Sequence, residues 1–137
     1  MITDRSHFED LEKMLRSIKK RRENQAKQPA PILVHCSAGI GRTGTMIAIY
    51  CIIEAVEWII KFNHMSNSEY RNEENKSQIN LIEADFGEDL MKPRISVFGT
   101  VRRLREQRWS MVKKQVQYGF IYDFCEYYIE NYIANNI

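Results

Sequence analysis

The spacing of apolar residues predicts a first helix from about Ser6 to Arg22. Ser6 and Glu9 form a capping box, in which each side chain satisfies a free backbone amide at the start of the helix. Four apolar residues recur on one face of this helix: Phe8, Leu11, Leu15 and Ile18. We expect that face to be buried.

The middle of the chain is its most apolar part. Ile32 to His35 is a short apolar run, which predicts a buried strand. Arg42 to Ile60 is apolar on most sides, as is typical of a helix at the centre of a domain. We therefore expect a strand, a glycine-rich loop and a central helix in direct succession.

Two further helices are predicted near the end of the chain, from about Ser96 to Glu106 and from about Gln115 to Tyr132. Each has an apolar face, formed by Val97, Val101 and Leu104 in the first and by Phe120, Phe124 and Tyr128 in the second. The aromatic stripe favours a core position over a ligand site.

Residues 63–92 are polar and irregular in pattern, which is typical of a solvated insertion. Acidic residues alternate with apolar ones near the end of this segment: Leu81, Ile82, Glu83, Asp85, Phe86, Glu88, Asp89 and Leu90. Composition favours a plain surface loop there. A motif that binds a protein partner is the competing interpretation.

Composition narrows the class of protein. The chain has 137 residues, of which 44% are hydrophobic and 28% charged, enough for one small domain with a modest core. Its 20 basic and 18 acidic side chains leave a net charge of +2, too balanced to indicate nucleic-acid binding. Basic residues do gather near the C-terminus, where a solvated helix face is the simpler interpretation and a rim that attracts acidic phosphopeptides is the alternative.

Several other site classes find little support. Three cysteines, at 36, 51 and 125, have no paired spacing, which argues against a disulfide framework and favours a reducing cytoplasm. The N-terminus lacks a signal peptide's apolar core, and Glu54 and Glu57 interrupt the long apolar stretch, so we expect no membrane span. The histidines share no ligand spacing, so we expect no metal.

The loop from His35 to Gly44 carries the strongest chemical signal. It sets Cys36 and Arg42 at opposite ends of a glycine-rich turn that opens a helix. Backbone amides at such a helix start bind anions without needing a charged side chain. The predicted phosphate-binding loop comprises Ser37, Ala38, Gly39, Ile40, Gly41 and Arg42.

Each polar side chain around this loop suits one role in phosphoryl transfer. A helix start lowers the pKa of a thiol, so Cys36 is predicted to be a nucleophilic thiolate. The planar fork of Arg42 can hold two phosphate oxygens, and the hydroxyl of Thr43 can stabilise the sulfur. We expect His35 to orient the loop. The competing interpretation is a buried structural cysteine, because free cysteine often serves as a small core residue.

These residues resemble the signature loop of the protein-tyrosine phosphatases. The C-terminal part extends the likeness to the closing helices of the tyrosine-specific class, through Val101–Arg108, Met111-Val112, Gln117-Tyr118, Phe120–Tyr122 and Glu126-Tyr127. The resemblance implies an α/β fold: a truncated phosphatase domain over residues 1–137, mostly helical, with a buried strand feeding the loop. It also implies phosphotyrosine proteins as partners and no cofactor.

Departures from the family pattern put the activity in doubt. The family's general acid is an aspartate in a Trp-Pro-Asp loop, which does not occur in this sequence, and neither Asp4 nor Asp10 is assigned that role. Lys113 and Lys114 stand where the family has glutamine and threonine, whereas Gln117 matches its second glutamine. The resemblance therefore implies impaired hydrolysis of phosphotyrosine through a phospho-cysteine intermediate.

Three interpretations of function stay open. The chain is a working phosphatase, a non-catalytic relative that binds or traps phosphotyrosine proteins, or a fragment that does not fold alone. The polar insertion and short length resemble the virus-borne phosphatases of parasitoid wasps, which would place the protein in a host-cell cytoplasm.

Overall fold

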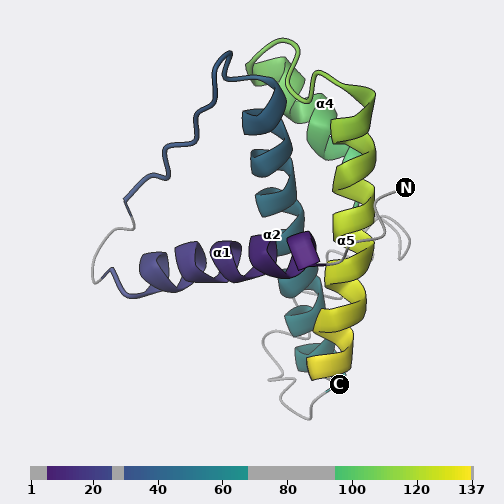
Figure 1. The fold of residues 1–137 in the computed structure, drawn as a ribbon. Coiled ribbons are helices and arrows are strands. Elements are labelled where there is room, and N and C mark those ends of the chain that lie inside the picture. The colour runs from purple at the N-terminus through teal and green to yellow at the C-terminus, as the bar shows by residue number, and fades with distance from the viewer. Residues whose placement is uncertain (1–5, 26–29, 68–94, 137) are drawn as a thin grey trace, which may run out of the picture. The chain divides into compact units, whose positions relative to one another are not determined.

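A computed structural model of the chain describes residues 6–25, 30–67 and 95–136. The described residues form four helices in chain order (Figure 1): α1 (Ser6–Glu23), α2 (Gly41–Asn67), α4 (Val97–Gln107) and α5 (Gln115–Asn136). All four were predicted, and their starts agree with the sequence pattern to within about one residue. The bounds of α2 differ most, because this helix continues to Asn67 rather than ending near Ile60.

The predicted buried strand is wrong. No residue from Pro31 to Cys36 has strand pairing in the structure, and the run is solvent-accessible, with Leu33 87% and Ile32 39% exposed. A strand needs a neighbouring strand to take up its backbone hydrogen bonds, and the described residues contain none. The described part of the chain is therefore helical, with one extended segment leading into the phosphate-binding loop.

The chain divides into two compact units, residues 1–53 with 97–137, and residues 54–96. The first contains α1, the start of α2, α4 and α5. The described residues of the second are the rest of α2 and the two residues that precede α4. The predicted insertion at 63–92 lies outside the described residues except for its first part, which belongs to α2.

The core of the first unit forms from the apolar faces that the sequence pattern predicts. Phe8 and Leu15 of α1 are buried, as are Val97, Val101 and Leu104 of α4. Ala48, Ile49 and Ile52 are buried on α2, and Ile121, Phe124 and Tyr128 on α5. Of the predicted aromatic stripe on α5, Phe124 and Tyr128 are thus in the core, whereas Phe120 is half-buried, as are Leu11 and Ile18 of the predicted face on α1.

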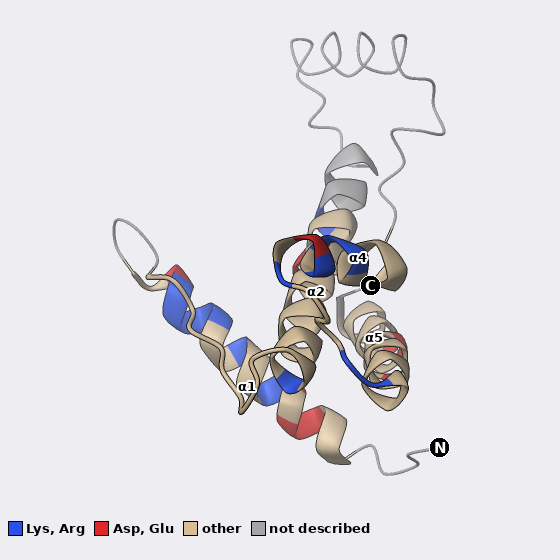
Figure 2. Cartoon of the chain, turned by 90° about the horizontal axis from the view of Figure 1, so that it is seen from above, with Lys and Arg blue, Asp and Glu red and all other residues tan. Residues whose placement is uncertain are grey.

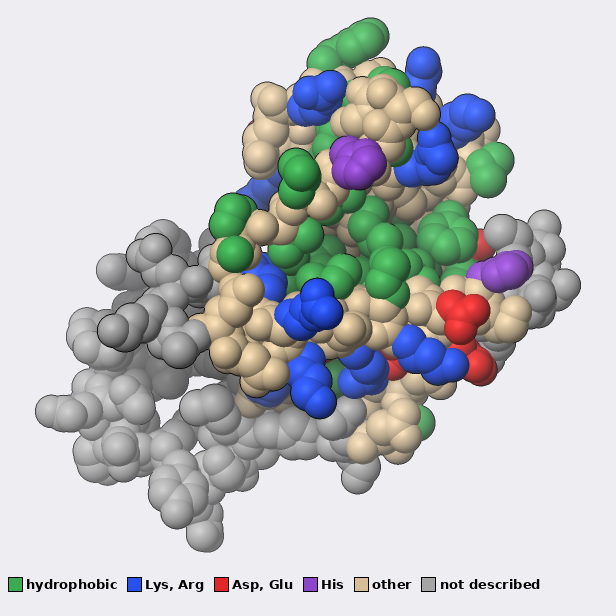
Figure 3. All heavy atoms as spheres, turned by 60° about the vertical axis from the view of Figure 1, so that its left-hand side comes forward, with side chains coloured by type: hydrophobic (Ala, Val, Ile, Leu, Met, Phe, Trp, Pro, Cys, Tyr) green, Lys and Arg blue, Asp and Glu red, His purple; other side chains and the backbone are tan. Residues whose placement is uncertain are grey.

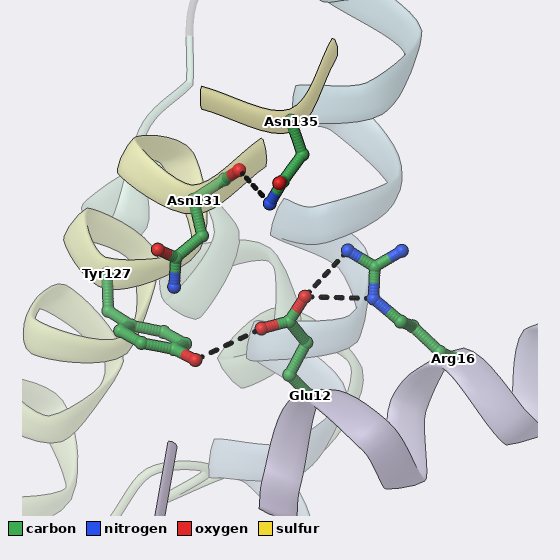
Figure 4. Close-up of polar contacts among 5 residues, drawn as sticks. All are labelled: Glu12, Arg16, Tyr127, Asn131 and Asn135. Atoms are coloured by element: carbon green, nitrogen blue, oxygen red, sulfur yellow. Dashed lines mark hydrogen bonds and ion pairs between the residues drawn. The ribbon is translucent and has the colours of Figure 1, made fainter. Parts of the chain in front are cut away.

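Helix α1 is held against α5 by aromatic and polar contacts. The ring of Phe8 lies 5.5 Å from that of Phe120, 5.7 Å from Phe124 and 5.4 Å from Tyr127, measured between centroids. Figure 4 shows Glu12 between Arg16 and Tyr127: its Oε2 accepts a bond of 3.2 Å from the Tyr127 hydroxyl, and its Oε1 accepts two from Arg16. Burial and the nearby Glu12 carboxylate raise the pKa of Tyr127.

One described helix meets the length and composition of a membrane span, Gly41–Lys61, with a mean hydropathy of 1.6. Half of its apolar window is buried inside the structure. The core helix of a soluble protein meets the same criteria, so this is weak evidence for a span. The absence of a membrane span stays a prediction.

Candidate active site

The loop that follows Cys36 turns tightly into the start of α2. Gly39 has a φ of 67°, a backbone conformation that favours glycine because it has no Cβ. The carbonyl of Ile40 accepts two hydrogen bonds, 3.1 Å from the amide of Gly44 and 3.0 Å from the amide of Val112. The first belongs to the opening turn of α2, and the second ties the loop to the segment between α4 and α5.

That segment is itself held in an unusual conformation. Ser110 and Val112 have φ values of 66° and 60°, which are uncommon for residues with a side chain. Arg105 donates from Nε to the carbonyl of Met111 at 2.9 Å and from Nη2 to that of Val112 at 3.0 Å. Met111 and Val112 are buried. The Arg105 fork therefore holds the amide of Val112 where it reaches the phosphate-binding loop.

Two glycines allow the start of α2 to lie close to the segment between α4 and α5 and to the first turn of α5. A Cβ on Gly44 would lie 2.6 Å from the backbone nitrogen of Val112, and one on Gly41 would lie 2.9 Å from Nε2 of Gln117. Real Cβ atoms do not approach backbone atoms so closely, so a larger residue at Gly44 would displace the 111–112 backbone. Both glycines therefore have a packing role at the base of the loop.

The sulfur of Cys36 lies in an environment that favours its ionised form. Thr43 Oγ1 donates a hydrogen bond of 3.0 Å to Sγ. That bond is the main reason that the pKa of Cys36 falls from its ordinary 9.0 to about 6, and the bond from the Thr43 amide is the next cause. Burial opposes the fall, and bonds from the amides of Gly39 and Ile40 lower the pKa by smaller amounts. Cys36 is therefore mostly a thiolate at neutral pH.

A cavity of about 200 Å³ opens above this sulfur. It is lined by Cys36, Ser37, Ala38, Ile40, Gly41, Arg42, Lys113, Lys114 and Gln117. Arg42 is exposed, and its Nη2 donates to Ser37 Oγ at 3.1 Å, so its guanidinium lies along the loop. The cavity thus brings together a thiolate, three cations and the amides of a helix start, a set that suits a phosphate group.

No carboxyl group lines this cavity among the described residues. Asp10 is exposed on α1, and Asp4 lies outside the described residues. Those residues also contain no cluster of three or more His, Cys, Asp or Glu side chains that could hold a metal ion. Figure 2 shows Lys and Arg on α1, on α4 and on the segment that enters α5, which carries two of the cavity's lysines.

The sequence model of the family described as "Protein-tyrosine phosphatase" matches residues 3–83 and 78–127 of this chain. The chain belongs to the protein-tyrosine phosphatase family. Membership of this family, which the sequence resemblance predicted, is therefore confirmed. The wasp-virus origin stays a prediction.

Curated members of the phosphatase family match most of this chain. It is 34% identical to receptor-type tyrosine-protein phosphatase epsilon of Rattus norvegicus over 117 residues, which is 85% of this chain and 12% of that protein. It is 32% identical to tyrosine-protein phosphatase corkscrew of Drosophila virilis over 108 residues, or 79% of this chain and 10% of the relative. Tyrosine-protein phosphatase 2 of Schizosaccharomyces pombe is 31% identical over 90% of this chain and 14% of its own length. The chain thus spans a small part of these relatives.

The predicted site residues of this phosphatase-family chain lie together, with one exception. Cys36, Arg42 and Gln117 line one cavity, and Thr43 bonds to the Cys36 sulfur. Gln117 Oε1 accepts a bond of 3.0 Å from the amide of Lys114, which fixes the side chain at the rim. His35 is exposed, with no hydrogen bond to another described residue, so its orienting role stays a prediction.

Two residues of the site were missed by sequence reasoning. Arg105 braces the 111–112 segment, and Arg108 Nη2 donates to the carbonyl of Ala38 at 3.3 Å, directly on the loop. Both belong to the basic cluster for which a solvated helix face was the favoured interpretation. Both side chains are exposed, as that interpretation expects, but each also bonds to a backbone carbonyl. The cluster of arginines was the available signal, but the partner of Arg108, the carbonyl of Ala38, lies far away in the sequence.

Proposed function

We propose that this chain is a cysteine-based protein-tyrosine phosphatase that forms a phospho-cysteine intermediate, with Cys36 as its nucleophile. The observation that carries the proposal is the hydrogen bond from Thr43 to the Cys36 sulfur, at 3.0 Å, in a site where the pKa of the thiol is about 6. A thiolate is the reactive form of cysteine, and its place at the base of an anion cavity favours attack on phosphorus.

Phosphate binding would rest on the loop amides and Arg42. Backbone amides at the start of α2 would hold the non-bridging oxygens, and the Arg42 fork would bind two of them. Lys113 and Lys114 add positive charge at the rim. This charge favours a doubly charged phosphoryl group and acidic residues beside it, so the substrates we propose are phosphotyrosine proteins with acidic neighbours.

The reaction would proceed in two displacements. The Cys36 thiolate attacks phosphorus, the S–P bond forms, and the bond to the tyrosine oxygen breaks with its electron pair leaving on that oxygen. Thr43 is placed to donate to the sulfur when it leaves again. Water then attacks phosphorus, the S–P bond breaks, inorganic phosphate departs and the thiolate is restored.

In this proposal, the rate of the first displacement depends on how easily the leaving oxygen departs. A tyrosine oxygen leaves more easily when a general acid protonates it, which typically contributes about 10²- to 10⁴-fold to a rate. Because no carboxyl group lines the cavity among the described residues, we expect phosphotyrosine to react slowly and activated aryl phosphates to react faster.

A second function has an observation in its favour. Lys113 and Lys114 line the cavity, and none of the described residues that line it is an acid, an arrangement that suits phosphate binding but offers no group for proton transfer. A chain of this kind could bind phosphotyrosine proteins and shield them, or stop at the phospho-cysteine. Both functions need Cys36 and Arg42, and a reducing compartment such as the predicted cytoplasm would keep the thiol free.

The deciding experiment is a time course of p-nitrophenol release from p-nitrophenyl phosphate, normalised to the concentration of purified chain. Cys36→Ser is the control for the nucleophile, and Cys51→Ser controls for loss of an exposed thiol elsewhere. Steady release over many turnovers, abolished only in Cys36→Ser, would support the enzyme.

Other outcomes assign the chain differently. A burst of one equivalent, with phosphate trapped on Cys36, would support a phosphotyrosine trap. No release, together with retention of a phosphotyrosine peptide by the folded chain, would support a non-catalytic binder. A chain that aggregates and shows no cooperative melting would support neither function for this chain alone.

A further inference from the structure

The side chain of Arg108 lies against the backbone of the phosphate-binding loop. Its Nη2 donates to the carbonyl of Ala38 at 3.3 Å. A Cβ on Gly39 would lie 3.4 Å from the same Nη2 and 3.7 Å from Cζ, so the guanidinium covers the backbone at that position. Arg108 is not among the residues that line the cavity above Cys36. It therefore contacts the loop from outside the cavity.

The backbone of Arg108 is fixed where α4 ends. Its amide donates to the carbonyl of Leu104 at 2.9 Å, which continues the helical bonding of α4 by one residue. Further along, the amide of Val112 donates to the carbonyl of Ile40 at 3.0 Å. The segment that follows α4 therefore binds two carbonyls of the loop, those of Ala38 and Ile40.

One peptide unit links the carbonyl of Ala38 to the amide of Gly39. In a trans peptide these two groups point in opposite directions. The amide of Gly39 bonds to the sulfur of Cys36 and is one of the backbone donors that lower the pKa of this thiol. Because Arg108 holds the carbonyl end of this peptide unit, it also fixes the direction of the amide end.

The loop by itself does not fix the direction of this peptide unit. Gly39 has a φ of 67°, and glycine adopts positive and negative φ with similar ease. Rotation of the unit by half a turn would exchange its two ends, so the Ala38 carbonyl oxygen would face the cysteine. An oxygen there would disfavour both a thiolate and a bound phosphate, since all three carry negative charge. A contact from elsewhere in the fold is therefore needed to select one orientation.

We propose that Arg108 is a positioning residue for the phosphate-binding loop: its bond to the Ala38 carbonyl keeps the Gly39 amide directed toward the cysteine and a bound phosphate. This role rests on the proposed function, because it presupposes that the loop binds phosphate. Arg108 transfers no proton and makes no bond to the substrate. It keeps a hydrogen-bond donor, rather than an acceptor, at the place where the anion binds.

Positive charge alone is the competing explanation for any effect of Arg108. Figure 3 shows Lys and Arg side chains at the upper end of the described surface, the end at which Figure 1 places α4 and the start of α2. An arginine in such a group attracts anions whatever it bonds to. The two explanations differ in their response to salt, because added salt screens exposed charges but does not change the direction of a peptide unit.

The test measures the thiol and phosphate binding without turnover, in the full chain with its exposed Cys51 replaced by serine. The rate of alkylation by iodoacetamide as a function of pH gives the pKa of Cys36. Protection from alkylation by inorganic phosphate gives the dissociation constant of phosphate. In Arg108→Met we expect the pKa of Cys36 to rise and phosphate to bind about threefold to tenfold more weakly than in the parent, by the same ratio at low and high salt.

A matched control removes one positive charge without touching the loop. Arg103 is exposed on α4 and is not among the residues that line the cavity. Arg103→Met should therefore change neither the pKa of Cys36 nor the affinity for phosphate. Arg108→Lys keeps the charge and a donor at the end of a long side chain, so it should restore part of the affinity that Arg108→Met loses.

Nuclear magnetic resonance reports on the peptide unit directly. In the parent, the amide signal of Gly39 should follow the titration of Cys36, because this amide bonds to the sulfur. In Arg108→Met it should follow that titration much less. Thermal melts by circular dichroism confirm that each variant is folded, as we expect for the loss of an exposed side chain.

Each result bears on the proposal. A raised thiol pKa and weaker phosphate binding in folded Arg108→Met, at both salt concentrations, would support it. A difference that high salt removes, or an equal effect of Arg103→Met, would overturn it in favour of charge alone. A parent chain that phosphate does not protect would overturn the proposed phosphate site as well. A protected parent with an unchanged Arg108→Met would overturn only the positioning role.

Discussion

The hydroxyl of Thr43 donates a hydrogen bond to the sulfur of Cys36 across 3.0 Å, and this bond is the main cause of a thiol pKa near 6. Removing the donor in Thr43→Ala should raise that pKa toward the ordinary 9.0, because the thiolate loses its strongest stabilising contact. Thr43→Ser keeps a hydroxyl and should stay near the parent. The pKa of Cys36 in each variant is measured from the rate of alkylation by iodoacetamide as a function of pH.

The alkylation experiment is best done with Cys51 replaced by serine, since Cys51 is exposed and would react as well. At pH 7 the parent should react several-fold faster than Thr43→Ala, because most of its sulfur is already ionised. If both variants titrated with the same midpoint as the parent, the loop amides rather than Thr43 would control the thiol.

Gly44 is expected to tolerate no side chain. Gly44→Ala should destabilise the fold by about 1–3 kcal/mol, because its methyl group would overlap the 111–112 backbone. The Cβ would lie 2.6 Å from the Val112 nitrogen. Gly119→Ala is the matched control: a Cβ there meets nothing within 4 Å, and a glycine within a helix costs about 0.5–1 kcal/mol relative to alanine, so it should stabilise. Urea denaturation measures both.

Arg105 is expected to matter more to stability than its exposed neighbour Arg102. Arg105→Met removes two bonds to the Met111 and Val112 carbonyls and should cost about 1–2 kcal/mol of unfolding free energy. Arg102→Met removes only an exposed pair with Glu106, at 3.4 Å, which is worth about 0.2–0.5 kcal/mol. Equal losses in urea denaturation would contradict the bracing role of Arg105.

Cys125 should make the fold sensitive to high pH. Burial raises its pKa from 9.0 to about 12. An acid whose folded pKa is raised contributes stability that is present below the unfolded pKa and is lost as pH rises from about 9 to 12. Thermal melts over that range should fall more steeply for the parent than for Cys125→Ala. Parallel slopes would show that Cys125 ionises equally easily in both states.

Much of the helical architecture could be read from the sequence, because each helix has a regular apolar face. Phe8, Val101 and Phe124 lie at the positions where the spacing predicted burial. The strand at Ile32 to His35 could not be judged in this way, because an apolar run becomes a strand only if another strand pairs with it.

The sequence by itself indicated the family and predicted the nucleophile and the phosphate-binding loop, because Cys36, Arg42 and the glycines lie within one short turn at a helix start. Only the tertiary structure decided how that turn is supported. The bonds from Val112 to Ile40 and from Arg108 to Ala38 join residues far apart along the chain, and local spacing carries no information about such pairs. Folding alone brings their donors and acceptors within reach.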